Sequence, residues 1–207
     1  MKTEDRARIR QLIDIYGEDF ERALNLEGPF KDEGYLMNKR IERIIDYLSL
    51  LGVKRLLDVG CGPGVVAVKI NKRLGIEVDA VDFSEKQVEK ARRLVAWERA
   101  KVRVFHEDIL APSPSSGLRH RSYDIVLCKD VLGAYRREEK KEFIEELIKY
   151  VKLKGHLIMS VLSYAEGVES PYSEPPNSYT KLLREIAGKE PYIERMDEHA
   201  LLLDVRL

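Results

Sequence analysis

The sequence feature that most constrains the fold is a short apolar run that leads directly into a glycine-rich turn. A predicted strand, Arg55 to Val59, is followed by glycines at alternate positions, Gly60, Gly62 and Gly64, before a helical pattern begins. Glycine allows a left-handed backbone and a close approach of a ligand to the chain. The first turn of the following helix offers free N–H groups. This order of elements is typical of a nucleotide-binding βαβ unit.

The residues around the glycines distinguish two kinds of ligand. The spacing is GxGxG, because Val65 stands where dinucleotide-binding turns place their third glycine. Asp58 directly precedes the turn, and its carboxylate repels a pyrophosphate but suits a ligand with positive charge and amino hydrogens. S-adenosylmethionine carries a sulfonium and an ammonium group and no phosphate. The turn, which includes Cys61 and Gly64, therefore favours this cofactor over NAD, and a tight turn without a ligand is the structural alternative.

The chain after this turn alternates between short apolar runs and amphipathic helices, which predicts a mostly parallel α/β sheet. Further strands are expected at 77–81, 102–105, 123–128 and 156–162, and helices at 64–75, 84–99, 137–151 and 179–187. Ser84 is a suitable N-cap, with Gln87 three residues later to complete a capping box. The last two apolar runs, 192–196 and 201–205, predict an antiparallel hairpin at the edge of the sheet.

Two acidic residues follow the second and third predicted strands and extend the candidate site. Asp82 lies about 20 residues beyond the glycine turn, where an acid accepts hydrogen bonds from ribose hydroxyls. Phe83 offers an aromatic surface to adenine. Asp108 can accept from the adenine amino group, with the N–H of the next residue directed at a ring nitrogen. Helix capping by Asp82 and core packing by Phe83 are the alternatives, and we interpret His106 as a bystander at the end of a strand.

The motifs LLDVGCGPG, VDFS, HEDIL and YDIVLCKDVL together resemble the ordered motifs of the class I S-adenosylmethionine-dependent methyltransferases. The resemblance covers residues 55–162 closely and the final hairpin more loosely. It implies a Rossmann-like three-layer sandwich with a sheet of about seven strands, the last of them antiparallel. The cofactor contacts that it implies are Asp58, Gly60, Gly62, Asp82, Phe83, Asp108 and Ile109.

A helical segment precedes this region and matches no particular subfamily. Apolar residues recur at helical spacing over 3–26 and again over 38–51, with Gly52 as a candidate C-cap. We expect residues 1–52 to form a helical cap or lid and residues 53–207 to form one methyltransferase domain. Tyrosines in the cap and after the fifth strand suggest an aromatic acceptor pocket, with ordinary packing as the alternative: Tyr16, Tyr35, Tyr164, Tyr172 and Tyr179.

The residues after the fourth predicted strand bear on mechanism. Methyl transfer from a sulfonium is an in-line displacement, which depends mainly on positioning and needs a general base only if the nucleophile carries a proton. Lys129 is expected to line the cofactor pocket, and Asp130 is the candidate base or acceptor-orienting group. Solvated charge at a strand end is the alternative for both. The Asn/Asp-Pro-Pro-aromatic box of amino-methylating nucleic-acid enzymes is absent here, which argues against that activity.

Charge composition bears on the acceptor. The charges of the 36 basic and 36 acidic residues cancel, and this balance disfavours a nucleic-acid partner. The basic run Arg119-His120-Arg121 could contact phosphates, so an RNA substrate is the alternative. We therefore expect a small-molecule acceptor, and the sequence does not indicate an oligomeric state. RNA or protein methylation, a non-catalytic cofactor-binding protein and, last, an NAD-dependent oxidoreductase are the other hypotheses.

The hydropathy and the residue composition of the chain bear on its location, its metal content and its stability. No apolar run reaches the roughly 20 residues needed to cross a bilayer, and the first residues do not resemble a signal peptide. These features predict a cytoplasmic protein without a membrane partner. Cys61 and Cys128 form no CxxC pair and the four histidines are scattered, so no metal site is expected. Abundant Lys, Arg and Glu with little Gln resembles the composition of thermophile proteins.

Overall fold

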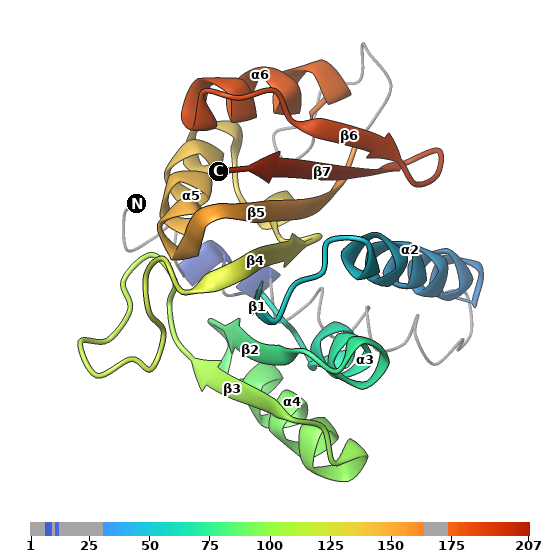
Figure 1. Ribbon diagram of the computed structural model, residues 1–207, viewed down its shortest axis with the longest axis vertical. Coiled ribbons are helices and arrows are strands. Elements are labelled where there is room, and N and C mark those ends of the chain that lie inside the picture. Colours follow the sequence, from blue (N-terminus) through green and yellow to red (C-terminus); the bar gives the residue numbers. More distant parts are fainter. Residues whose placement is uncertain (1–6, 10, 13–30, 164–173) are drawn as a thin grey trace.

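A computed structural model describes residues 7–9, 11–12, 31–163 and 174–207, in which seven strands form one sheet (Figure 1). The strands are β1 Arg55–Val59, β2 Glu77–Asp82, β3 Val102–His106, β4 Tyr123–Lys129, β5 Val151–Leu162, β6 Tyr192–Arg195 and β7 Ala200–Arg206. Their order is β3-β2-β1-β4-β5-β7-β6. Strands β1 to β5 pair in parallel, and β7 is antiparallel to both β5 and β6. The predicted fold class and the C-terminal hairpin are confirmed.

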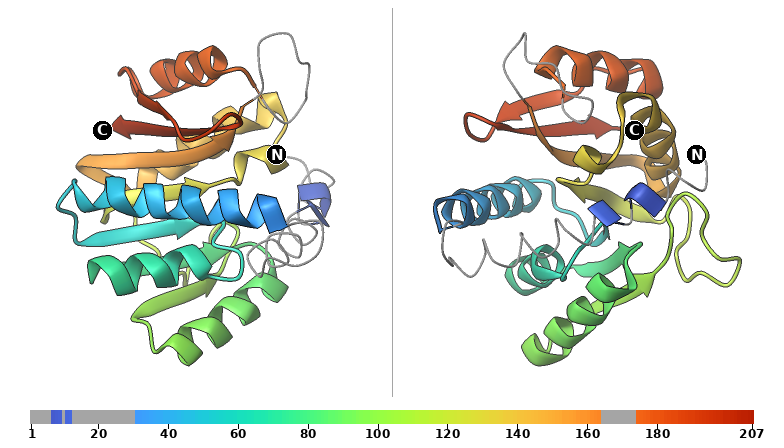
Figure 2. Two further views of the ribbon diagram at one scale, coloured as in Figure 1. Left: turned by 90° about the vertical axis from the view of Figure 1, so that its right-hand side faces the viewer. Right: turned by 180° about the vertical axis from the view of Figure 1, so that it is seen from behind.

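Helices cover both faces of the sheet, which gives three layers (Figure 2). They are α2 Lys31–Ser49, α3 Val65–Leu74, α4 Glu85–Glu98, the 3₁₀ turn η2 Leu132–Ala134, α5 Arg137–Tyr150 and α6 Pro176–Ala187. One apolar core joins the sheet to α2, α3 and α4, and a second joins it to α5 and α6. No helix in the described ranges is long and apolar enough to cross a membrane.

The order of the strands places the candidate site. Strand β1 lies between β2 and β4, so the crossover connections leave it in opposite directions. Ligands of open α/β sheets bind at the carboxyl ends of the strands where this reversal occurs. The glycine turn follows β1 at that point, with Gly64 as the N-cap of α3 and Gly75 as its C-cap.

Helix α2 belongs to one of the layers on the sheet. Its buried side chains Ile41, Ile44, Ile45 and Leu48 lie in the same core as Leu56 of β1. The helix begins at Lys31, earlier than the predicted 38, and ends three residues before Gly52. The predicted cap of residues 1–52 therefore includes a helix that packs on the sheet. Any lid would have to be formed by residues before Lys31, and most of these, including the greater part of the helix predicted over 3–26, lie outside the described residues.

Strand β5 begins at Val151, five residues before the predicted start. Tyr123 pairs with Val151 and Ile125 pairs with His156, so the residues between them form a bulge. Lys154 in this bulge has a left-handed φ of 65°. A Cβ on Gly155 would lie 2.8 Å from the carbonyl oxygen of Asp124, so the bulge requires glycine there. Val151, Lys152, Leu153 and Lys154 alternate in polarity, but Gly155 separates them from the apolar run that follows, so the predicted strand starts only at His156.

The segment between β5 and α6 is held at its two ends. The hydroxyl of Ser163 donates to the carbonyl oxygen of Glu174, at 3.0 Å. The carboxylate of Glu174 is buried and accepts from Lys140 of α5, which is also buried, at 3.2 Å. Helix α6 then begins at Pro176, because proline is accepted in the first turn of a helix. Residues 163 and 174 thus lie side by side at the end of the sheet.

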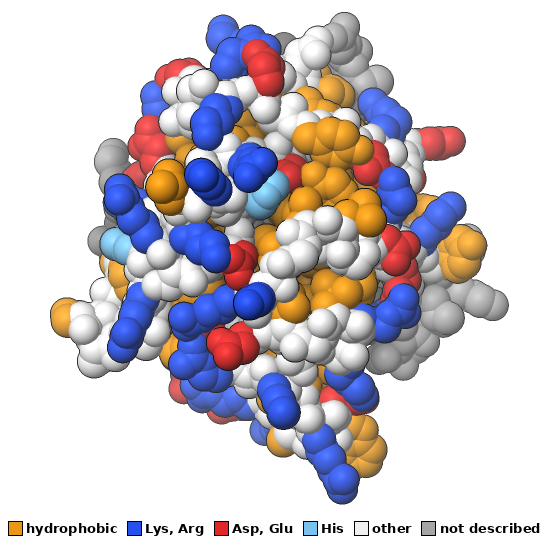
Figure 3. Space-filling model, in the orientation of Figure 1, with side chains coloured by type: hydrophobic (Ala, Val, Ile, Leu, Met, Phe, Trp, Pro, Cys, Tyr) orange, Lys and Arg blue, Asp and Glu red, His pale blue; other side chains and the backbone are white. Residues whose placement is uncertain are grey.

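The surface at the amino ends of the parallel strands is rich in basic side chains. Figure 3 shows this face of the molecule, with Lys and Arg gathered over the strand starts and with few acidic side chains among them. The chain as a whole has a formal net charge of zero. Positive charge is therefore concentrated on this face and balanced by acidic groups elsewhere.

Candidate functional site

The glycine turn after β1 has the backbone geometry that its sequence predicts. Gly60, Gly62 and Gly64 have φ angles of 71°, 52° and 82°, all in the left-handed region. A Cβ on Gly60 would lie 2.3 Å from Val131, whereas nothing lies within 4 Å of a Cβ placed on Gly62. The turn is therefore packed against the end of β4 at its first glycine and open at its second. The side chain of Cys61 is buried below it.

Asp82, the last residue of β2, organises this turn. Its carboxylate accepts from the N–H of Gly62 at 2.8 Å and from the N–H of Ser84 at 2.9 Å. The side chain is buried, with 2% exposure. Capping of the turn, the structural alternative for Asp82, is thus present. Each carboxylate oxygen has more than one lone pair, so these bonds leave capacity for ribose hydroxyls as well.

Asp58 is a buried carboxylate with an oxygen that lacks any protein partner. It is 2% exposed, and Oδ2 accepts no hydrogen bond from any residue that the structure describes. Burial raises the pKa of Asp58 to about 7; the nearby Lys129 ammonium lowers it and the Asp82 carboxylate raises it further. An unsatisfied buried carboxylate is costly unless a ligand pairs with it. Asp58 therefore has the properties of a group that receives a cationic or N–H-bearing ligand.

The end of β3 supplies an acid and a free donor. Oδ1 of Asp108 accepts from the N–H of Leu110 at 3.0 Å, which forms a tight turn. The N–H of Ile109 donates to no residue in the described ranges, while its side chain is buried in the core. His106 is exposed, with Nε2 3.3 Å from the carbonyl oxygen of Phe83, as expected of a bystander. Phe83 itself is partly buried.

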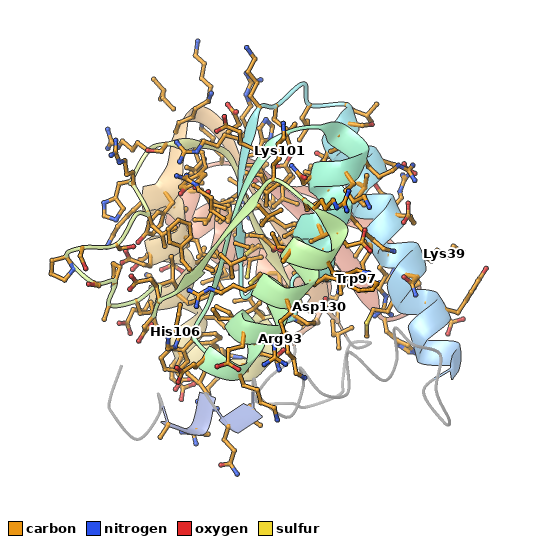
Figure 4. The ribbon with its side chains drawn as sticks, turned by 90° about the horizontal axis from the view of Figure 1, so that it is seen from below. Lys39, Arg93, Trp97, Lys101, His106 and Asp130 are labelled. Atoms are coloured by element: carbon orange, nitrogen blue, oxygen red, sulfur yellow. The ribbon has the colours of Figure 1, made fainter. Side chains whose placement is uncertain are left out.

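The carboxylates converge on one place. Burial is the main cause that raises the pKa of Tyr135, and the charges of Cys128, Asp108 and Asp82 raise it further, so these groups lie in one neighbourhood. The charge of Asp82 likewise raises the pKa of Asp58. In Figure 4, His106 and Asp130 lie on the side of the molecule away from Lys101, which marks the amino end of β3. The predicted rim of acids at the carboxyl ends of β1, β2 and β3 is therefore present.

Lys129 and Asp130 form an ion pair at the end of β4. The ammonium of Lys129 contacts Oδ2 of Asp130, and the hydroxyl of Ser160 donates to Oδ1 at 2.8 Å. Asp130 has a left-handed φ of 57°, and its N–H donates to the carbonyl oxygen of Ser160 at 2.9 Å. Lys129 is buried and close to Asp58, as expected of a residue that lines the pocket. Because both oxygens of Asp130 are already engaged, its geometry suits orientation better than proton abstraction.

Two residues near the site were not assigned to it from the sequence. Tyr135 stacks on Phe143 with ring centroids 4.3 Å apart, below the rim of acids. Gln87 is fully buried in the first turn of α4, and neither Oε1 nor Nε2 has a partner among the residues that the structure describes. The backbone N–H of Gln87 donates to Ser84 Oγ at 3.3 Å, so only half of the predicted capping box forms. A buried unpaired amide was not predictable, because the box motif assigns that side chain a partner.

The predicted aromatic acceptor pocket is not formed by the tyrosines that the structure describes. Tyr35 is 67% exposed on α2, and Tyr179 is buried in the core beside Lys140. The other three lie outside the described residues. The cap does approach the site: the guanidinium of Arg8 donates to the carbonyl oxygen of Ala134 at 3.1 Å and to Glu139 at 2.7 Å. Ile9 is buried in the core with the site residues.

These residues fit S-adenosylmethionine. Asp58 presents an unpaired carboxylate oxygen, Ile109 presents a free N–H, and Gly62 leaves open space where a side chain would stand. None of these features suits a diphosphate next to Asp58. No group of three or more potential metal ligands occurs in the part of the chain that the structure describes.

Comparison with known proteins agrees with this geometry. Residues 56–155 match the sequence model of a family described as a methyltransferase domain. The chain is 28% identical over 142 residues to a ubiquinone biosynthesis O-methyltransferase of Vibrio cholerae, which covers 69% of this chain and 56% of that protein. A mitochondrial protein of the same name from Schizosaccharomyces pombe is 28% identical over 113 residues, or 53% of this chain and 38% of that one. The chain thus spans about half the length of the curated relatives that it matches.

Solved structures share the fold over almost the whole chain. Magnesium protoporphyrin IX methyltransferase of Synechocystis, solved with bound S-adenosylhomocysteine, has a TM-score of 0.75 at 21% identity and covers 97% of this chain and 98% of its own. A [4+2]-cyclase has a TM-score of 0.66 at 17% identity, with 79% of each chain covered. At these identities the likeness concerns the fold alone.

The sequence match and the three-layer fold define a class of protein. Residues 56–155 match a methyltransferase-domain family, and the fold of the chain is that of the class I S-adenosylmethionine-dependent methyltransferases. This confirms the resemblance that the motifs between Leu56 and Leu132 indicate.

Proposed function

We propose that this chain binds S-adenosylmethionine at the carboxyl ends of β1 to β4 and transfers its methyl group to a small-molecule acceptor. The cofactor supplies a methyl group on a positively charged sulfur, which is displaced by an in-line nucleophile. The observation that carries the proposal is the buried Asp58 carboxylate with its unpaired oxygen, next to a glycine turn held open by Asp82. S-adenosylhomocysteine is the expected product.

Each residue of the site has a proposed task in binding. Asp58 receives the amino group of the methionine part, and Asp82 receives the ribose hydroxyls. Ile109 donates its free N–H to the adenine ring, and Asp108 accepts from the adenine amino group. Phe83 covers the adenine face, while Gly60, Cys61, Gly62 and Gly64 let the backbone approach. These assignments remain predictions that rest on the burial and hydrogen bonds described above.

We assign the ion pair of Lys129 and Asp130 a positioning role. Lys129 lowers the cost of an ionised Asp58, because its ammonium lies close to that carboxylate. Asp130, held by Lys129 and Ser160, keeps the end of β4 in the left-handed conformation that faces the acceptor. Holding the nucleophile in line with the transferred methyl group is the main source of rate in such a displacement.

The names of two matched proteins refer to small molecules: one is an O-methyltransferase of ubiquinone biosynthesis, and the other is a magnesium protoporphyrin IX methyltransferase. They support a small-molecule acceptor here, together with the absence of an amine-orienting box after β4. We also propose a cytoplasmic location. RNA or protein as acceptor is the alternative within the same reaction.

A binding role without methyl transfer is the second candidate function. It is favoured by Asp130, both of whose oxygens are engaged, and by the [4+2]-cyclase with the same fold. The test has two stages. S-adenosylhomocysteine, but not NADH, should raise the melting temperature, since a ligand at 100 times its dissociation constant stabilises by about 2.7 kcal/mol. An assay with labelled S-adenosylmethionine over pools of metabolites, RNA and proteins then separates transfer from binding.

The contacts of Arg8 support a cap over the acceptor side of the site. Deletion of Met1 to Glu27 should therefore abolish acceptor turnover and leave the affinity for S-adenosylhomocysteine nearly unchanged. Arg8→Ala is the milder variant, because it breaks the contact with Glu139 and keeps Ile9 in the core. Equal losses of turnover and cofactor affinity in both variants would contradict a cap on the acceptor side.

A further inference from the structure

The amino ends of the parallel strands form a second distinctive surface, at the opposite end of the sheet from the cofactor site. We call this surface the amino-edge face and define it by its exposed basic residues: Lys54, Lys101, Arg119, Arg121, Lys152, Lys154 and Arg206. Figure 3 shows how closely such side chains gather there. Backbone hydrogen bonds hold two of these residues to neighbouring elements: the N–H of Arg121 donates to the carbonyl oxygen of Lys149 at 2.8 Å, and the N–H of Lys154 donates to that of Leu207 at 2.8 Å.

Most of these cations have no acidic partner. Lys54, Lys101, Arg119, Arg121, Lys154 and Arg206 form no ion pair with any residue that the structure describes. Most acidic side chains at this edge already form ion pairs with basic residues. Asp79 is paired with Arg55 and Arg103, and Asp124 is paired with Lys152. Glu77 is an exposed acid at the start of β2. The face as a whole therefore has a surplus of positive charge although the chain is neutral.

An apolar side chain projects from the middle of this basic surface. Leu153 is 82% exposed and stands in the β5 bulge between Lys152 and Lys154. Leu50, at the end of α2 and four residues before Lys54, is 80% exposed. The bulge that presents Leu153 is held by a left-handed Lys154 and by a glycine that admits no side chain. The conformation of Lys154 and the close packing at Gly155 therefore keep Leu153 directed into solvent.

We propose that the amino-edge face binds the surface of an anionic lipid bilayer. Basic side chains gain energy near anionic head groups, and exposed leucines insert at the boundary between head groups and acyl chains. Lysines on both sides of an apolar residue suit this boundary, because their stems lie in the apolar region while their ammonium groups reach the phosphates. Such peripheral binding needs no membrane-spanning segment. The amino acid sequence predicts no membrane partner because it has no spanning segment, but a peripheral surface binds a bilayer without one.

The apolar component separates a bilayer from a nucleic acid. Phosphates of RNA or DNA would be bound by Arg119 and Arg121 as well, and affinity for them falls with salt in the same way. The exposed leucine in the bulge offers no hydrogen-bonding group or charge to a phosphate. Leu153 therefore provides the distinguishing variant.

The test uses sedimentation of the full chain with vesicles of phosphatidylglycerol mixed with phosphatidylcholine, and with vesicles of phosphatidylcholine alone. We expect binding to the first vesicles only, and its loss at high salt. Lys154→Gln combined with Arg206→Gln should weaken it roughly twenty-five-fold, at about fivefold for each basic residue removed. Leu153→Ala should weaken it about fivefold or more, because the inserted apolar area shrinks.

The matched control is Lys39→Gln combined with Lys181→Gln, which changes the net charge equally at two exposed lysines outside this face. It should leave vesicle binding within twofold. All variants should keep the affinity of the wild type for S-adenosylhomocysteine, whose site lies at the other end of the sheet. Equal losses with the control pair, no binding to anionic vesicles, or tighter binding to an RNA oligonucleotide that Leu153→Ala leaves unchanged would each overturn the proposal.

Discussion

The neighbouring strands β1 and β2 each bury an aspartate, and the contrast between the two environments separates a binding group from a structural one. Asp58 lies near the carboxyl end of β1, Asp79 lies in the first half of β2, and both are 2% exposed. Asp79 accepts from Arg103 at 2.6 and 2.7 Å, from Arg55 at 3.1 Å and from the hydroxyl of Tyr123 at 2.8 Å. Asp58 keeps an oxygen with no partner.

The pKa values of the two groups shift in opposite directions for this reason. Burial alone raises the pKa of both. At Asp79 the hydrogen bonds from Arg103, Tyr123 and Arg55 outweigh burial and lower the pKa. At Asp58 the charge of Lys129 offsets burial only in part, and the pKa is about 7. A buried carboxylate whose partners are complete supports the fold, whereas one whose partners are incomplete is available to a ligand.

The largest expected effect comes from removing the structural aspartate. Asp79→Ala should lower the free energy of unfolding by about 3–5 kcal/mol, because it leaves Arg55 and the Tyr123 hydroxyl without their partner. Urea denaturation at neutral pH measures the change, with the exposed Asp46→Ala as control. Since the pKa of Asp79 is lowered on folding, its contribution should be present at neutral pH and lost as the pH falls below about 4. A variant as stable as the wild type would show that Asp79 is not structural.

Asp58→Asn should act in the opposite sense on stability. The pKa of Asp58 is raised on folding, so its ionisation costs stability as the pH rises from about 4 through about 7. The interval between 3.8 and about 7 corresponds to about 4 kcal/mol as an upper bound. At pH 8 without ligand, Asp58→Asn should therefore be more stable than the wild type, and below pH 4 it should be equal.

The same variant should bind less ligand. Loss of a charged hydrogen-bond acceptor corresponds to about 1.5–3 kcal/mol, and titration calorimetry with S-adenosylhomocysteine at pH 8 measures it. In the wild type the affinity should rise as the pH increases through about 7, since the ionised carboxylate is the form that pairs with an amino group. Greater stability without weaker binding would remove Asp58 from the proposed site.

The next prediction compares the affinity for S-adenosylhomocysteine of variants at Asp82 and at Asp130. Asp82→Ala should weaken S-adenosylhomocysteine binding by about 1–3 kcal/mol, because it removes an acceptor and releases the N–H of Gly62. Asp130→Ala should weaken it less and should reduce methyl transfer instead. Calorimetry on both variants decides the order, and an unchanged affinity for Asp82→Ala would withdraw that assignment.

The smallest expected effect concerns Gln87. Gln87→Met keeps the volume of the side chain and removes an amide that has no partner in the protein, so the free energy of unfolding should rise by about 1 kcal/mol. Thermal denaturation without ligand measures this. Destabilisation instead would mean that the amide is satisfied, and a parallel loss of cofactor affinity would assign it to the ligand.

The sequence predicted those parts that short-range chemistry determines. The glycine turn, the strand-end acids and the hairpin each follow from local patterns, so β1, α3 and β7 lie within a residue of their predicted bounds. What escaped prediction depends on distant residues. The ion pairs and hydrogen bonds of Asp79 were not predicted, because its partners Arg103 and Tyr123 come from other strands. The pairing of Asp130 with Ser160, 30 residues away, equally required the register of β4 on β5.

The bond between Ser163 and Glu174 has a consequence for engineering. Because Ser163 is bonded to Glu174, and Glu174 in turn to Lys140 of α5, the end of β5 is tied to the start of α6 by contacts among described residues. The entropy of closing such a loop varies slowly with its length. Changes in the length of the chain between Ser163 and Glu174 should therefore have only a small effect on the free energy of unfolding.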